Sequence, residues 1–265
     1  MQDREARFMT GGTTCATGDI TEAAMPYLRR YGRALTGDQT TGDLLAAKAR
    51  HAARKTPTDV SVMAIRLLLF SKLHESWKEI RSASFSQTAA RRKMMGLTKN
   101  SRETLLLRTI EEFSFHEIAQ ILDIEEHEAE HLFDTALEEI PYRNGTSVLM
   151  IEDDPMVAMD MVSCLSEMGC NVVGVAKTAA EAIEMATKST PEMIIASLIL
   201  ADKSSGLIAT DKILQAKPDT HVVFVTPYPE QLLSGTAQEP VFIITKPHFD
   251  GQVRSAISQL FILRG

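Results

Sequence analysis

The sequence predicts a two-part protein, an all-α N-terminal region followed by an α/β domain with a doubly wound, five-stranded parallel sheet. Two patterns predict this division. Up to about residue 140, apolar residues recur at the three- and four-residue spacing of amphipathic helices. From Ser147 onward, five short β-branched runs alternate with five helical stretches, which is the pattern of strands joined by crossover helices.

The composition indicates a folded protein and argues against several other classes. Hydrophobic residues make up 44% of the 265 residues, enough for two cores of ordinary size. No apolar run approaches the roughly 20 residues that span a bilayer, and no signal peptide is visible. Cys15, Cys164 and Cys170 form neither a disulfide framework nor a metal-binding spacing. We therefore expect a cytoplasmic protein without a membrane segment.

Changes in residue composition and hydrophobic pattern along the chain predict its domain boundaries. A polar, basic stretch separates two helical blocks, and a short turn-rich stretch containing Asn144-Gly145 precedes the α/β pattern. The expected organisation is a mobile leader (1–19), a first helical block (20–81), a linker (82–96), a second helical block (97–140), an interdomain turn (141–146) and the α/β domain (147–265).

The second helical block is predicted to contain three helices. Asn100 or Ser101 can cap the first. Ser114 with Glu117 three residues later forms a capping box that starts a short helix ending at Leu122. The third helix is expected from about Glu125 to Ile140.

The α/β domain is predicted element by element from its apolar runs. The expected helices lie near 156–168, 178–188, 206–216, 228–235 and 250–262. The expected strands are Val148–Ile151, Asn171–Val175, Met193–Ala196, His221–Val225 and Val241–Thr245. In such a sheet the functional site lies beyond the carboxyl ends of the strands.

Polar side chains follow three of these strands where each ends. Glu152 and Asp153 follow the first strand, Thr226 follows the fourth and Lys246 follows the fifth. Two clustered carboxylates suit Mg²⁺, which needs few protein ligands. A lysine and a threonine reaching the same place can bind phosphoryl oxygens. The strand ends therefore predict a phosphoryl pocket.

In this order and spacing, these residues resemble the receiver domain of two-component response regulators. The resemblance implies the CheY or flavodoxin-like strand order 2-1-3-4-5, Mg²⁺ in the pocket, and a histidine kinase or phosphotransfer protein as the phosphoryl source. The family's phosphate-accepting Asp ends strand three, a position that Ser197 occupies here, in PEMIIASLILADKSSG. A serine is a poor acceptor from phosphohistidine, because it lacks the carboxylate that attacks phosphorus and also binds the metal.

Ser197 leaves three interpretations open. In the first, the receiver is degenerate at its acceptor and folds without switching. In the second, an engineered Asp→Ser replacement locks one state. In the third, Asp202 in the following loop is the acceptor. Without the third carboxylate, Mg²⁺ is expected to bind Glu152 and Asp153 weakly.

The helical blocks resemble an extracytoplasmic-function sigma factor. The block at 97–140 resembles region 4, whose helix-turn-helix reads DNA, in the segment FSFHEIAQILDIEEHEAEHLFDTALEEI. The first block resembles the start of region 2 in the segment YLRRYGRALTGDQTTGD. Between Asp123 and Glu139, however, there are eight acidic residues and no Lys or Arg, so the DNA backbone would repel this helix. The acids are either a solvated face or a surface for a basic protein, with Glu125, Glu126, Glu128 and Glu130 as the candidates.

A sigma-like module in front of a receiver is the arrangement of the PhyR family, which the whole chain resembles, including VLMIEDDPMVAMD and TPYPEQLLSG…FIITKPH. The resemblance implies an anti-anti-sigma factor of the general stress response, whose phosphorylated receiver frees the sigma-like part to capture a small, NepR-like anti-sigma protein. Tyr228 and Phe242 are either candidates to move with the switch or simply part of the core. Ser197 and Lys203, which replaces a loop glycine, depart from the family.

Two other functions are weighed against this one. A DNA-binding regulator would use the helix-turn-helix at 114–140, but its second helix has the wrong charge, so no nucleic-acid partner is expected. An enzyme is not expected either, because neither a nucleophile–base pair nor a glycine-rich phosphate loop is visible in the sequence.

Overall fold

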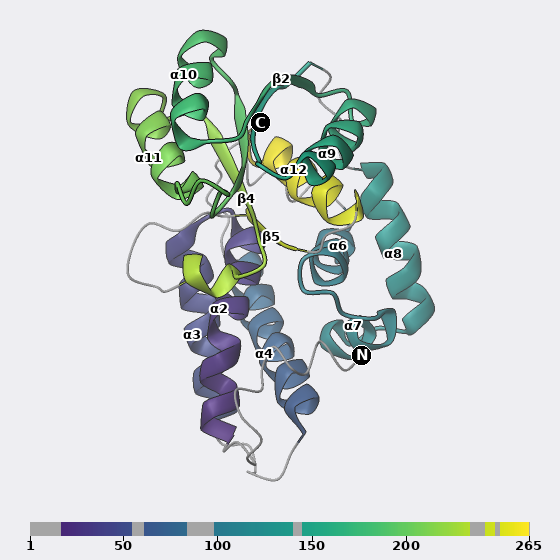
Figure 1. Ribbon diagram of the computed structural model, residues 1–265. Helices are drawn as coiled ribbons and strands as arrows, with labels where there is room; N and C mark the ends of the chain where they lie inside the picture. Colours follow the sequence, from purple (N-terminus) through teal and green to yellow (C-terminus); the bar gives the residue numbers. More distant parts are fainter. Residues whose placement is uncertain are drawn as a thin grey trace. The chain divides into compact units, whose positions relative to one another are not determined.

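The computed structural model describes residues 17–54, 61–83, 98–139, 145–233, 242–246 and 250–264. Its contacts divide the chain into two compact units. The helical unit consists of Met1–Glu139 with Leu233–Val241, and the α/β unit consists of Ile140–Leu232 with Phe242–Gly265. The predicted fold classes of both parts are confirmed (Figure 1). Within the described ranges, no helix has both the length and the apolarity that crossing a membrane requires.

The first half of the helical unit is a group of three helices: α2 (Thr17–Thr36), α3 (Gln39–Ala53) and α4 (Val62–Ala83). The expected stop at Thr36-Gly37 is present, because α2 ends there and Gly37 adopts a φ of 71°. The Asp38 side chain then accepts a hydrogen bond from the Thr41 N–H and starts α3. The expected leader reaches to residue 19, but α2 already begins at Thr17, and residues 1–16 lie outside the described ranges.

The second half of the helical unit holds α6 (Ser101–Thr109), α7 (Phe115–Leu122) and α8 (Glu126–Glu139). The capping box of Ser114 and Glu117 is confirmed at the start of α7. Asn100 precedes α6 in a left-handed conformation but makes no side-chain cap, whereas the Ser101 hydroxyl donates to the Thr98 carbonyl and to Glu139. α6 is buried almost all round, whereas α8 buries a narrow stripe made of Ala129, Leu132 and Ala136.

The α/β unit has a five-stranded, all-parallel sheet in the order β2-β1-β3-β4-β5, as expected. The central strand β3 is buried along its whole length, as strands covered on both faces are. The strands are β1 (Ser147–Ile151), β2 (Asn171–Ala176), β3 (Met193–Ser197), β4 (His221–Thr226) and β5 (Phe242–Thr245).

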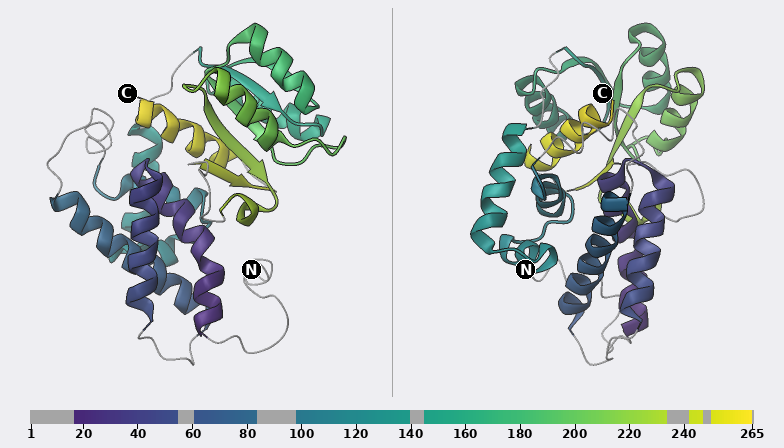
Figure 2. Two further views of the ribbon diagram at one scale, coloured as in Figure 1. Left: turned by 90° about the vertical axis from the view of Figure 1, so that its left-hand side faces the viewer. Right: turned by 180° about the vertical axis from the view of Figure 1, so that it is seen from behind.

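Helices cover both faces of this sheet, in the doubly wound arrangement (Figure 2). Helices α9 (Pro155–Glu167) and α12 (Asp250–Arg264) pack together on one face, and α10 (Ala179–Ser189) and α11 (Gly206–Ala216) pack together on the other. Side chains at the strand-to-helix turns start three of these helices: Asp154 caps α9, Thr178 caps α10 and Ser205 caps α11. The carboxyl ends of the strands are thereby held at fixed positions.

The connection between β4 and β5 differs from the prediction. A helix was expected near 228–235, but the structure has a 3₁₀ turn, η1, over Pro229–Leu232 only. The proline fixes the backbone for a first turn, and Leu232 and Leu233 are already buried. Residues 234–241 lie outside the described ranges, so the end of the predicted helix and Val241 of the predicted strand are not described.

Candidate functional site

The ends of β1, β3 and β5 bring together three of the side chains singled out in the sequence. Glu152 follows β1, Ser197 ends β3 and Lys246 follows β5. Parallel strands in the order β1-β3-β4-β5 place these ends on one edge of the sheet. The structure thus brings the three side chains into contact, although Glu152 lies 45 and 94 positions from Ser197 and Lys246 in the chain.

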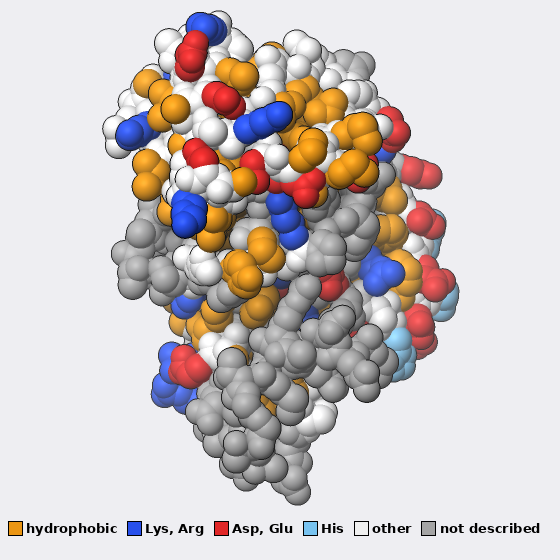
Figure 3. Space-filling view, viewed as in Figure 1, with side chains coloured by type: hydrophobic (Ala, Val, Ile, Leu, Met, Phe, Trp, Pro, Cys, Tyr) orange, Lys and Arg blue, Asp and Glu red, His pale blue; other side chains and the backbone are white. Residues whose placement is uncertain are grey.

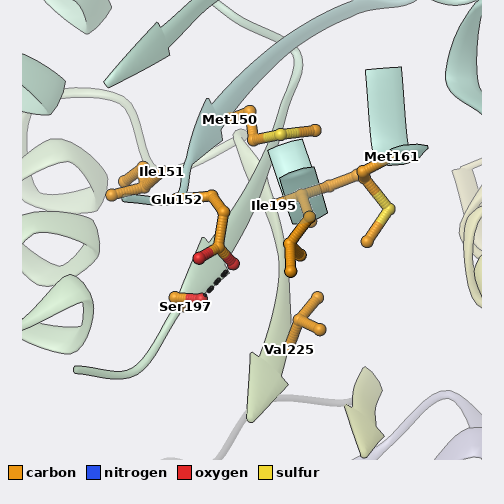
Figure 4. Close-up of a pocket in the computed structure, with 8 residues that line it drawn as sticks. Met150, Ile151, Glu152, Met161, Ile195, Ser197 and Val225 are labelled. Carbon is orange, nitrogen blue, oxygen red and sulfur yellow. Dashed lines mark hydrogen bonds between the residues drawn. The ribbon is translucent and has the colours of Figure 1, made fainter. Parts of the chain in front are cut away.

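Glu152, Ser197 and Lys246 form a closed triangle of hydrogen bonds. The Ser197 hydroxyl donates to Oε2 of Glu152 at 2.5 Å, a contact drawn in Figure 4. The Lys246 ammonium donates to the same carboxylate oxygen at 2.6 Å and to the Ser197 hydroxyl at 2.8 Å. Glu152 and Ser197 are buried, and the Lys246 side chain is 23% exposed. The lysine thus neutralises the carboxylate, and the serine occupies the remaining corner.

Two members of the triangle, Glu152 and Ser197, line a small, mostly apolar cavity. Met150, Ile195, Met161 and Val225 lie around it, with Glu152 and Ser197 supplying its polar atoms (Figure 4). This environment does not suit Ser197 for nucleophilic attack. The carboxylate that its hydroxyl contacts is already paired with the Lys246 ammonium, so the serine has no unpaired carboxylate beside it.

The three acidic residues after β1, Glu152, Asp153 and Asp154, make different contacts. Glu152 takes part in the triangle, and its second oxygen accepts the Asp154 N–H at 3.2 Å. Asp154 points the other way and caps α9 through the N–H groups of Met156 and Val157. Asp153 lies between them, half-buried. Only Glu152 and Asp153 are therefore left to face a ligand at the pocket.

Thr226 ends β4 and is almost fully buried, and its hydroxyl takes part in a hydrogen bond with a residue of the following turn. It accepts a hydrogen bond of 3.1 Å from the N–H of Tyr228, which closes the turn after the strand. Tyr228 is 51% exposed, whereas Phe242 is completely buried at the start of β5. Of the two residues proposed to move with a switch, Tyr228 therefore has the freedom to do so, and Phe242 is packed as core.

The loop after β3 is a tight hairpin that carries Asp202 on an exposed turn. The Asp202 carboxylate accepts the Ser204 N–H at 2.8 Å, and this hydrogen bonding lowers the pKa of Asp202. Lys203 adopts a φ of 63°, the left-handed conformation that favours glycine. The family resemblance implies a loop glycine at the position of Lys203, and the backbone conformation explains why glycine suits it.

Gly206 is a site residue that the sequence analysis did not single out. A Cβ atom there would lie 1.9 Å from the carbonyl oxygen of Ser197, so α11 can begin only with a glycine at this point. The Ser204-Ser205-Gly206 sequence, in which a helix cap is followed by glycine after the hairpin that follows β3, is the signal that points to it.

The residues present do not fit a magnesium site in this arrangement. Receiver domains typically bind Mg²⁺ in this pocket, through carboxylate oxygens. Here one oxygen of Glu152 is shared by Lys246 and Ser197, and the position of the third carboxylate is a hydroxyl. Within the described part of the chain, no group of three His, Cys, Asp or Glu side chains is placed to hold a metal ion.

A second feature is the acidic surface of α8, in the helical unit. Glu125, Glu126, Glu128 and Glu130 are all exposed, as a partner-binding surface requires. Figure 3 shows acidic and histidine side chains gathered over this helix. Glu126 also lies 3.3 Å from the ring of His116 on α7. The acids project to solvent along one helix, and this helix is the one that would enter the major groove in a DNA-binding helix-turn-helix.

Comparison with known families places a match on both units. The model of the response regulator receiver domain matches residues 148–258. The model of the sigma-like domain of the response regulator PhyR matches residues 94–142, and that of the Sigma2 domain of PhyR matches residues 21–74.

Individual relatives match over nearly the whole chain. The phyllosphere-induced regulator PhyR of Methylorubrum extorquens is 34% identical over 251 residues, which cover 92% of this chain and 94% of that protein. The crystal structure of the response regulator PhyR from Brucella abortus has a TM-score of 0.77 at 34% identity and covers 92% of this chain and 93% of that chain. The anti-anti-sigma factor PhyR from Bartonella quintana has a TM-score of 0.77 at 31% identity, covering 94% and 97%.

Proposed function

The chain belongs to the PhyR family, and we propose that it is a response regulator of the general stress response that acts as an anti-anti-sigma factor. The observation that carries the proposal is the extent of the similarity, which covers 92% of the chain and includes both sigma-like parts and the receiver. The Bartonella quintana relative is itself an anti-anti-sigma factor. Such a protein acts by occupying an anti-sigma factor, which then releases its sigma factor.

We propose that the partner is a small, NepR-like anti-sigma protein with a basic surface, and that the helical unit binds it. The exposed acids Glu125, Glu126, Glu128 and Glu130 would meet that surface. DNA is not proposed as a partner, because α8 carries acidic residues without a lysine or arginine to contact phosphate. The function is binding in the cytoplasm and not catalysis.

The proposed domain organisation follows the predicted boundaries: a leader at 1–19, sigma region 2-like helices at 20–81, a linker at 82–96, a sigma region 4-like helix-turn-helix at 97–140, a turn at 141–146 and the receiver at 147–265. Support comes from the family matches, whose limits of 21–74, 94–142 and 148–258 fall close to these boundaries.

In the receiver we propose that Ser197 stands at the acceptor position and that phosphorylation no longer controls the domain. The triangle supports this, since Lys246 already neutralises Glu152 in the absence of a phosphoryl group. Glu152 and Asp153 would hold Mg²⁺ only weakly, and Thr226 would keep its hydrogen bond with Tyr228. A histidine kinase or phosphotransfer protein that recognises this receiver would dock without transferring phosphate to Ser197.

Binding to a purified NepR-like anti-sigma protein tests the proposal directly. We expect isothermal titration calorimetry with the full chain to show a one-to-one complex. Replacing the four acids with glutamine should weaken it about tenfold or more, because charge complementarity at an interface is worth on the order of 1–2 kcal/mol. Glu184→Gln, on an exposed face of the receiver, is the matched control. No detectable complex, or equal weakening by the control, would contradict the proposal.

A further inference from the structure

Charged side chains lie buried where the two halves of the helical unit meet. One half is α2–α4 and the other is α6–α8. Six side chains make hydrogen bonds between them and are each less than 9% exposed. We call this group the charged seam; its members are Arg30, Arg66, Trp77, Arg102, Glu103 and Glu111.

Glu111 is held from two helices of the first half. Arg30 on α2 donates to both of its carboxylate oxygens, at 2.9 and 3.0 Å, and also to the Ile110 carbonyl at 2.8 Å. Arg66 on α4 donates to the Glu111 carbonyl at 2.6 Å. Burial acts to lower the pKa of Arg30, but attraction to Glu111 outweighs it and the pKa is raised. The clamp is therefore a charged one.

Arg102 and Trp77 make further hydrogen bonds across the seam, one residue from each half. Arg102 on α6 donates to the carbonyls of Ala34 and Leu35, at 2.7 and 2.6 Å, and so caps the C-terminal end of α2. Burial lowers the pKa of Arg102 to about 10. The indole N–H of Trp77 on α4 donates to Glu103 on α6 at 3.0 Å. Each half thus satisfies polar groups that belong to the other.

The contacts across the seam are more polar than those of a permanent core, although Phe70 on α4 and Phe113 also pack edge to face between the two halves, with ring centroids 4.9 Å apart. Permanent interfaces are predominantly apolar, whereas interfaces that open and close are more polar and rich in arginine. Desolvating paired charges offsets much of their mutual attraction, so a buried ion pair contributes little net stability. Within the described residues, the buried hydroxyls of Tyr31 and Thr104 also have no hydrogen-bond partner. A permanent core would be expected to satisfy or omit such groups.

We propose that the charged seam is a latch between two separately folded lobes, and that the helical unit opens along it. When the seam opens, water replaces the lost hydrogen bonds, so neither lobe exposes a surface that is purely apolar. The movement takes place inside the helical unit and does not depend on which partner that unit binds.

Trp77 provides a native probe of the latch, because it is the chain's single tryptophan and lies in the seam at 8% exposure. In the full chain, Glu111→Gln removes the charge that Arg30 clamps. We expect acrylamide to quench Trp77 about threefold more strongly in this variant, because the open population rises. The helical circular dichroism should not change. Glu75→Gln is the matched control: it breaks an exposed ion pair with Lys72 on the same helix and should leave quenching as in the wild type.

Spin labels distinguish opening of the seam from loosening of one lobe. In a full chain with its native cysteines replaced, one pair of labels at Lys48 and Glu130 spans the two lobes, and a second pair at Lys48 and Glu75 stays within one. All three positions are exposed. Glu111→Gln should add a longer distance to the first pair and leave the second pair unchanged.

The remaining outcomes overturn the latch. If quenching and both distances stay at their wild-type values, the seam is a fixed part of the core. If both label pairs broaden together, or if the variant loses the circular dichroism of its helices, the halves do not fold separately.

Discussion

The Lys246 ammonium donates a hydrogen bond of 2.8 Å to the Ser197 hydroxyl at the end of β3, the position that we propose to be that of the phosphate acceptor. The same ammonium pairs with Glu152 at 2.6 Å. With an aspartate at position 197, this lysine would face one more negative charge and a metal would be needed to balance the carboxylates. With serine, the charge of Glu152 is balanced by the protein itself.

The first prediction concerns Lys246. Lys246→Met leaves the buried Glu152 carboxylate without its cation and should lower the free energy of unfolding of the receiver by about 1–3 kcal/mol. Adding Glu152→Gln should recover part of this loss, because the two residues interact. Urea unfolding measures both. Lys188→Met breaks an exposed pair with Glu184 and should change stability by no more than about 0.5 kcal/mol. An additive double variant would rule out the proposed pairing.

The second prediction concerns the missing carboxylate. Ser197→Asp places a third carboxylate beside Glu152 and Asp153, so the variant should bind Mg²⁺ and gain phosphate from acetyl phosphate. Calorimetry and intact-protein mass spectrometry measure the two gains. Ser197→Asn, of nearly the same shape but neutral, should show neither. Stoichiometric labelling of the wild-type chain would show instead that another residue, such as Asp202, accepts phosphate.

The third prediction concerns the hairpin after β3. Lys203 holds a left-handed conformation that costs a non-glycine residue about 1 kcal/mol. Lys203→Gly should therefore stabilise the receiver by a few tenths to about 1 kcal/mol. The same change at Lys212, within α11, should destabilise it by about 1 kcal/mol. Thermal unfolding of both variants measures the difference, and equal shifts of the same sign would contradict the backbone argument.

The fourth prediction concerns pH and Glu139. Burial acts to raise the pKa of Glu139, but hydrogen bonds from Thr98 and Ser101 outweigh it and lower the pKa below 4.5. A carboxyl group whose pKa is lowered by folding stabilises the fold above its unfolded pKa, and that contribution is lost as the pH falls through the folded value.

The wild-type helical unit should therefore lose more stability on acidification below about pH 4.5 than Glu139→Gln does. At pH 7 the variant should be less stable by about 0.5–1.5 kcal/mol. Trp77 fluorescence during urea unfolding reports on this unit alone, because the chain has one tryptophan. Parallel pH profiles for the two proteins would exclude a role for Glu139.

Much of this fold and of its site was predictable because the signals are local. Strand and helix periodicities predicted the α/β unit, the capping box located the start of α7, and the positions of Glu152 and Lys246 at strand ends predicted that these two side chains lie close together. The turn η1 was mistaken for the start of a longer helix, because Pro229 and the leucines after it fit both. The ends of short apolar runs do not distinguish a single turn from a helix.

Other features depend on contacts that are distant in sequence. The Arg30–Glu111 clamp joins residues 81 positions apart, and charged residues in a helical pattern are read as solvent-exposed by default. The steric conflict that a Cβ at position 206 would have with Ser197 is likewise visible only once the strand and the loop are folded. Hydrophobic periodicity locates apolar cores, but it does not reveal which charges are buried in pairs.

The affinity of the full chain for a NepR-like anti-sigma protein, measured with and without acetyl phosphate and Mg²⁺, shows whether phosphorylation controls this receiver. If Lys246 and Ser197 have replaced phosphorylation control, the dissociation constant should be the same in both conditions. A gain in affinity of about tenfold or more, equivalent to about 1.4 kcal/mol, would show instead that this receiver still switches by phosphorylation.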